Sequence, residues 1–113
     1  MSSRSDKARI QDILKSINSI QNRMTGIDFD SFCEDETTLK AVLYDLMIIG
    51  EAAKNISVET QAQAKDIPWQ LMSDMRNIIA HEYFQVNLRI TWSTVQNNLP
   101  KVIAPLQRLL NSI

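Results

Sequence analysis

Apolar residues recur at spacings of three and four in four separate segments of this chain, and no other feature of the sequence constrains the fold as strongly. The segments are residues 10–24, 39–56, 69–79 and 92–110. Because an α-helix has 3.6 residues per turn, this spacing places the apolar side chains of each segment along one helical face. Each such face needs a partner to bury it. The pattern therefore predicts an all-α fold, an up-and-down four-helix bundle.

Residues that favour helix ends stand at the borders of these segments. Ser5 and Asp6 form a start signal before the first segment, and Gly26 follows its last apolar residue. The acidic residues 35–36 are placed to interact with the positive N-terminal end of the second helix. Pro68 suits the first turn of the third helix. These signals predict boundaries that agree with the apolar pattern.

The connections and the last segment carry further signals. Residues 27–36, "IDFDSFCEDE", are acidic with interleaved aromatics, which predicts a loop or an additional short helix whose aromatic side chains dock on the core. Residues 57–66 are polar and have only a weak pattern. The fourth helix is expected to start near Asn87. Pro100 and Pro105 lie inside it and each removes a backbone donor, so this helix is predicted to be kinked or split.

Length and composition limit the possible functions. The 113 residues suit one domain, residues 1–113, and Gly and Pro are scarce. No apolar run can span a bilayer and no secretory h-region follows the polar start, which predicts a cytoplasmic protein. One cysteine, Cys33, and one histidine argue against a Cys/His zinc site. A net charge of −1 argues against nonspecific coating of nucleic acid, so any nucleic-acid contact must be local.

The only histidine lies in the stretch "MRNIIAHEYF", at the end of the third helical pattern. On an ideal helix Arg76 and Tyr83 are seven residues apart and share a face, whereas Arg76 and His81 are rotated by about 140° from one another. Arg76 and His81 converge only if the helix ends or bends near His81, or if a second copy of this surface supplies the missing group. Asn77 and His81 share a face and are close enough to hydrogen-bond.

These residue types together suit phosphodiester chemistry. The histidine side chain has an unperturbed pKa suited to proton transfer near neutral pH, and arginine holds phosphate oxygens through two donors. In RNA the 2′-hydroxyl can attack the adjacent phosphate without a metal or a protein nucleophile, provided that protons are moved and charge is stabilised. A symmetric dimer would bring two His81 and two Arg76 side chains into one cleft and make an acid and base pair possible.

The same residues also fit purely structural roles. A histidine in the last turn of a helix interacts with free carbonyls, and Arg76 fits a surface position paired with Glu82 or Asp74. The two tryptophans fit the core. Glu51 and Lys54 fit an exposed helix face, although Gly50 beside them permits close helix approach and their polar edge could line a cleft.

Several ordered segments resemble one known family. Arg76, Asn77, His81 and Tyr83 match the R-N-x-x-x-H-x-Y signature of the HEPN superfamily in its HepT-like toxin branch. The segments "IIGEAAK", "IPW" and "TWSTVQNNLP" occur in the same order and at similar spacing in that branch. The likeness covers nearly the whole chain.

The resemblance implies a small all-α homodimer with the motif gathered in a cleft at the interface. It implies a metal-independent RNA-cleaving toxin without a cofactor, in which Arg76 and His81 are catalytic and Asn77 supports them. It also implies a partner, a nucleotidyltransferase antitoxin of the MntA type, that transfers AMP from ATP to Tyr83. A nonenzymatic module that binds a nucleotide or docks the transferase is the alternative.

Overall fold

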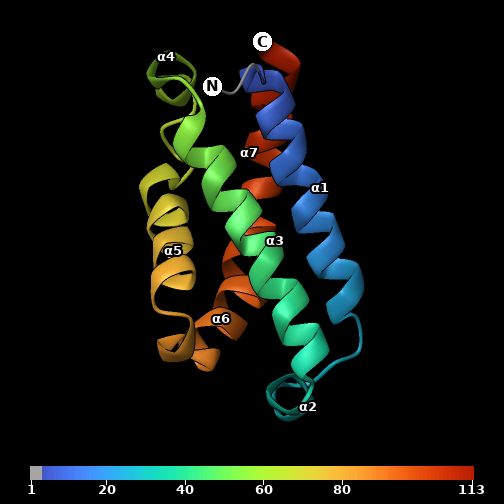
Figure 1. Ribbon diagram of the computed structural model, residues 1–113. Coiled ribbons are helices and arrows are strands. Elements are labelled where there is room, and N and C mark those ends of the chain that lie inside the picture. The colour runs from blue at the N-terminus through green and yellow to red at the C-terminus, as the bar shows by residue number, and fades with distance from the viewer. Residues whose placement is uncertain (1–3) are drawn as a thin grey trace.

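The structure is a computed structural model that describes residues 4–113, and every regular element in that range is helical. Four long helices form the bundle: α1 (Asp6–Met24), α3 (Glu36–Asn55), α5 (Trp69–His81) and α7 (Leu99–Ser112). In Figure 1, α3 lies between α1 and α5, and α7 lies behind them. The prediction of an all-α bundle is confirmed.

The core of the bundle is formed by the predicted apolar faces. Ile10, Ile13 and Ile20 of α1 are completely buried, and so are Val42 of α3 and Leu106 of α7. Both tryptophans belong to the packed interior: Trp69 is buried, and Trp92 is half-buried against the core. Burial of these side chains is the main source of stability for helices of this length.

Side-chain caps fix the predicted helix starts. Ser5 accepts a hydrogen bond from the backbone N–H of Ala8 at the start of α1. Asp35 accepts one from the backbone N–H of Thr38 at the start of α3. That backbone bond, followed by the bond from the Thr38 hydroxyl, holds the pKa of Asp35 below its usual value. Gly26 after α1 has φ +76°, a conformation that a glycine adopts without strain.

Two short helices fill the connections. The acidic segment contains α2 (Phe29–Glu34), and Phe32 from this helix is completely buried with its ring centroid 5.6 Å from that of Trp92. The predicted docking of this segment is therefore confirmed. The polar stretch forms α4 (Val58–Ala62), a helix that its weak pattern did not indicate. Asp6 explains this helix, because its carboxylate accepts hydrogen bonds from Ser57 and Thr60, more than fifty residues away.

Of the two forms predicted for the last helical pattern, kinked or split, the structure has the kinked one. Helix α6 (Leu88–Ser93) starts after Asn87, which caps it, and continues into a π-helical turn, η2 (Thr94–Asn98), before α7. The N–H of Leu99 donates to the carbonyl of Thr94, five residues back. This wider turn accommodates Pro100, which lacks an N–H and whose ring would clash with a regular preceding turn. Pro105 lies inside α7.

Pro68 precedes α5 as its N-cap residue, so its predicted place in the first turn is wrong by one position. No helix among residues 4–113 is long and apolar enough to cross a membrane.

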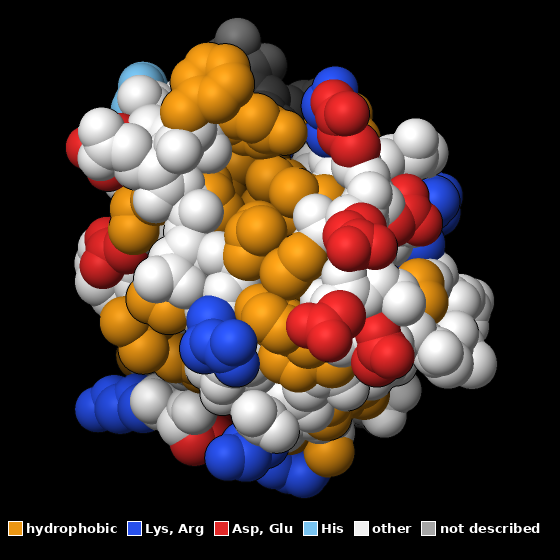
Figure 2. Space-filling view, turned by 90° about the horizontal axis from the view of Figure 1, so that it is seen from below, with side chains coloured by type: hydrophobic (Ala, Val, Ile, Leu, Met, Phe, Trp, Pro, Cys, Tyr) orange, Lys and Arg blue, Asp and Glu red, His pale blue; other side chains and the backbone are white. Residues whose placement is uncertain are grey.

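At the lower end of the bundle, Figure 2 shows a strip of hydrophobic side chains with carboxylates along one side. The acidic segment that contains α2 lies at this end, and its carboxylates are exposed.

Candidate functional site

Helices α3 and α5 are in tight contact at Gly50. A Cβ atom added there would lie 2.3 Å from the Cβ of Arg76 and 2.6 Å from the carbonyl oxygen of Met72. Only a residue without a side chain fits in this position. Because Gly50 has no side chain, the Cβ atom of Arg76 on α5 can pack directly against the backbone of α3. This agrees with the close helix approach expected from the sequence.

Arg76 is held by two oxygen atoms beside this contact. Its Nε lies 3.1 Å from Oε2 of Glu51 on α3, and its Nη1 donates to Oδ1 of Asn77 at 3.1 Å. The Arg76 side chain is 26% exposed. The expected pairing of Arg76 with Glu82 or Asp74 is wrong, because the carboxylate beside the guanidinium is that of Glu51 on α3. A guanidinium has five N–H donors, so this arrangement leaves donors for a phosphate.

His81 is the last residue of α5 and is exposed. Among residues 4–113 no side-chain hydrogen bond or ion pair is found for its imidazole, and the expected bond with Asn77 is not formed. Asn77 instead accepts from Arg76. Because α5 continues without a break to His81, the rotation of about 140° between Arg76 and His81 is retained. One copy of the chain therefore does not bring the two side chains together.

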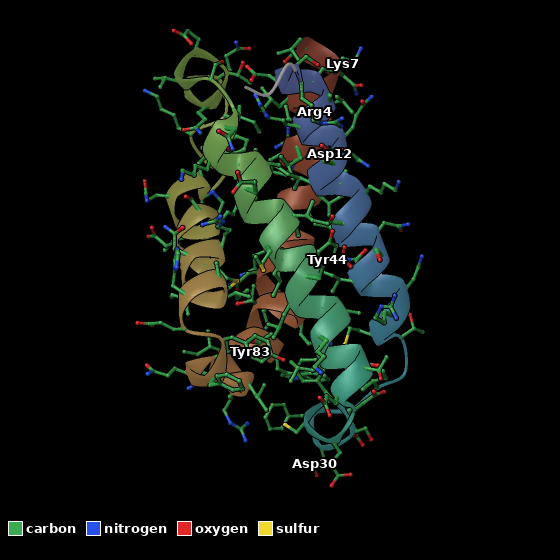
Figure 3. All side chains as sticks on the ribbon, in the orientation of Figure 1. Arg4, Lys7, Asp12, Asp30, Tyr44 and Tyr83 are labelled. Carbon is green, nitrogen blue, oxygen red and sulfur yellow. The ribbon has the colours of Figure 1, made fainter. Side chains whose placement is uncertain are left out.

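Tyr83 lies beyond the helix, in the 3₁₀ turn η1 (Tyr83–Gln85). The helical face that Tyr83 was expected to share with Arg76 does not exist, because α5 ends two residues earlier. The Tyr83 side chain is still accessible, at 37% exposure. Its ring meets that of Phe84 edge-on, with centroids 5.3 Å apart. Figure 3 shows Tyr83 at the lower end of the molecule, below the level of Tyr44.

Two adjoining hollows run along α3, and together we call them the α3 groove. The upper hollow, about 380 Å³, lies between α1, α3 and α5 and includes Arg76 and Glu51. The lower hollow, about 370 Å³, includes Lys40 and Tyr83. Tyr44 and Met47 line both hollows. The α3 groove thus connects the surroundings of Arg76 with those of Tyr83.

Sequence reasoning singled out neither Tyr44 nor Lys40. Tyr44 is 66% exposed, although it lies in the apolar run "AVLYDLMIIG". The signal was available: Tyr44 lies off the buried stripe of Val42, Leu43 and Leu46, as an exposed aromatic residue should. Lys40 makes an ion pair with Glu36 at 2.7 Å. The hydrogen bond from Lys40 to Glu36, and then the charge of Glu36, raise the pKa of Lys40, so it stays cationic at neutral pH.

No metal-ligand set is found in the described part of the chain. Among residues 4–113, no three His, Cys, Asp or Glu side chains lie close enough to hold a metal ion. The polar groups of the α3 groove are cations, carboxylates, amides and phenols. Of these groups, the cations bind phosphate and the phenol rings offer flat surfaces on which nucleobases stack.

Comparison with known proteins links this geometry to a family. A family profile described as "Ribonuclease HepT-like" matches residues 13–109. A protein of Thermococcus cleftensis named "Probable ribonuclease HepT" is 37% identical over 106 residues, which cover 94% of this chain and 96% of that protein. A "Putative RNase" of Caldanaerobacter subterraneus subsp. tengcongensis is 34% identical over 101 residues, 89% of this chain and 90% of that protein. No solved structure matches the chain.

Proposed function

The chain belongs to the HepT-like ribonuclease family, and we propose that it cleaves RNA at a site to which Arg76 of one copy and His81 of a second copy contribute. The observation that carries this proposal is the placement of the two side chains on one unbroken helix. Arg76 faces the α3 groove and is fixed by Glu51, whereas His81 is exposed at the helix end. A second copy supplies His81 to the site, because His81 of the same copy lies on another face of α5 than Arg76.

The proposed chemistry needs only these side chains and the RNA. The 2′-oxygen attacks the adjacent phosphorus while the bond from phosphorus to the 5′-oxygen breaks, and the 2′-proton must be removed as the leaving oxygen gains one. His81 accepts the 2′-proton and donates a proton to the leaving 5′-oxygen, since its imidazole suits both tasks near neutral pH. The free N–H donors of Arg76 stabilise the charge on the phosphate, and Asn77 helps to orient them.

The proposed biological role is that of a toxin that acts in the cytoplasm and is silenced by a nucleotidyltransferase of the MntA type. In this scheme the phenol oxygen of Tyr83 attacks the α-phosphorus of ATP, pyrophosphate leaves and the phenol loses its proton. The exposure of Tyr83 supports this, because the transferase must reach the hydroxyl. The added phosphodiester is negative and bulky, and it would occupy the lower hollow of the α3 groove, where RNA has to enter.

Substitution of each side chain tests the nuclease. His81→Ala and Arg76→Ala should each abolish RNA cleavage in the presence of a chelator and should relieve growth inhibition. Lys54→Ala is the matched control, since Lys54 is an exposed charge of α3 that lines neither hollow of the α3 groove. Circular dichroism should show unchanged helix content. A His81→Ala protein that cuts RNA at the parental rate refutes the mechanism, and retained RNA binding without cleavage in the parent would favour the nonenzymatic alternative.

A further inference from the structure

Tyr44 presents an aromatic ring to solvent in the middle of the α3 groove. Its side chain is 66% exposed, which is unusual for a large aromatic residue within a core helix. Beside it, Leu43, Met47 and Ile79 give the lower hollow an apolar lining. Among the described residues Tyr44 makes no ring contact and no side-chain hydrogen bond. The ring is therefore available to a ligand with a flat, partly apolar surface.

The charges around the groove have one dominant sign. The described side chains that line it include two more cations than carboxylates, whereas the whole chain has a net charge of −1. The charged residues are Arg4, Arg9, Lys40, Arg76, Asp12 and Glu51. When the ion pair of Lys40 with Glu36 is counted as well, the groove keeps a small excess of positive charge, which favours an anionic ligand.

The cations lie on both sides of the exposed ring. Lys40 precedes Tyr44 by four residues, one turn of α3, and lies on the same face. Arg76 lies at the other end, paired with Glu51. From Lys40 to Glu51 the helix rises about 16 Å, since each residue adds about 1.5 Å. An anionic chain with flat groups between its charges fits this order of cation, aromatic ring and cation.

We propose that a base of single-stranded RNA stacks on Tyr44 in the α3 groove, with phosphates of the same strand on either side of that base bound at Lys40 and Arg76. The inference rests on the proposed function and adds a substrate-binding residue to it. Aromatic platforms in positively charged grooves are the general means of holding single strands, because every base offers a π-face. A duplex is a poor ligand here, since its bases are already stacked on one another. Each hollow has the volume of an ordinary small-ligand site.

Binding of a strand that cannot be cut tests this inference separately from cleavage. The probe is a fluorescent 2′-O-methyl oligonucleotide of about eight nucleotides, a common site size, followed by anisotropy at low salt. Tyr44→Ala should weaken binding roughly 10-fold, as loss of one stacked base does. Tyr44→Phe should bind within about 2-fold of the parent, because stacking needs the ring and not the hydroxyl. Leu71→Ala is the matched control, since Leu71 is 69% exposed on α5 and does not line the groove.

The outcomes separate the possibilities. Unchanged affinity of Tyr44→Ala overturns the inference, and so does an equal loss in Tyr44→Phe. If Tyr44→Ala instead converts a dimer into a monomer by light scattering, the groove is a protein interface and the inference is also overturned. His81→Ala should bind the oligonucleotide as the parent does. Binding that depends on Tyr44 in a parent that cuts no RNA would refute the proposed nuclease and leave the stacking site standing.

Discussion

The carboxylate of Glu51 on α3 lies 3.1 Å from Nε of Arg76 on α5 and so ties the proposed phosphate-binding residue to the neighbouring helix. Glu51 is 54% exposed on its side chain, so the pair adds at most about 1 kcal/mol to the free energy of unfolding. Its importance is positional. A free arginine has many rotamers, and a carboxylate at Nε limits them while leaving other N–H groups for substrate.

Removal of this carboxylate should therefore lower activity more than stability. We predict that Glu51→Ala reduces kcat for RNA cleavage roughly 10-fold, because misplacement of a positioned group is costly. Glu51→Gln should recover part of the loss, since its amide oxygen still accepts from Nε. Steady-state cleavage assays with thermal unfolding measure both effects. Lys54→Ala serves as control, and a Glu51→Ala protein with the parental kcat contradicts the positional role.

The contact between α3 and α5 can also be tested by adding a side chain at Gly50. We predict that Gly50→Ala lowers the free energy of unfolding by about 2 kcal/mol, because the added Cβ meets the backbone oxygen of Met72 as well as Arg76, and overpacking typically costs ~1–3 kcal/mol. The gain in helix propensity, about 1 kcal/mol, offsets only part of this cost. Urea unfolding measures the change.

Gly26→Ala is the matched control for this substitution. A Cβ at Gly26 meets nothing within 4 Å, but its φ of +76° should still cost about 1 kcal/mol. Cleavage should fall in Gly50→Ala, where Arg76 is displaced, and should be retained in Gly26→Ala. If Gly50→Ala is as stable and as active as the parent, the helices can separate without consequence and the tight contact is not needed.

The contrast between Asp35 and Glu51 shows what the sequence could predict. Asp35 caps the helix that follows it by bonding to the N–H of Thr38, three residues along the chain. Such local signals, like the apolar spacing, can be identified in the sequence alone. Glu51 of α3 forms an ion pair with Arg76 of α5, and Asp6 accepts a hydrogen bond from Ser57, which is also far away in the sequence. Their partners depend on how the helices are aligned. The motif from Arg76 to Tyr83 was recognised as a sequence pattern, but the end of α5 at His81 places Tyr83 in a different element.

Tyr83 allows a test of the proposed control. We predict that coexpression with the cognate nucleotidyltransferase adds adenylyl groups to Tyr83, and that Tyr83→Phe remains toxic beside that partner, because it lacks the hydroxyl that accepts AMP. Peptide mass spectrometry and growth assays measure these outcomes. Tyr44→Phe is the control, as the other tyrosine of the same groove. An unmodified Tyr83 in fully neutralised protein would show that the partner inhibits by binding alone.

In the proposed site Arg76 acts with His81 of the other copy, and mixing of subunits tests this pairing. Arg76→Ala and His81→Ala homodimers should each be inactive. In a mixed dimer, the intact Arg76 of one subunit and the intact His81 of the other complete one of the two cross-subunit pairs, whereas neither subunit has both residues. Random pairing makes half of the dimers mixed, so refolding the two variants together should restore about one quarter of the parental cleavage rate.

The measurement is the rate of RNA cleavage in chelator after the two inactive variants are mixed, with formation of the mixed dimer verified by native mass spectrometry. We expect activity well above that of either variant alone. Activity that stays at the level of the single variants, although mixed dimers have formed, would contradict a site shared between two copies.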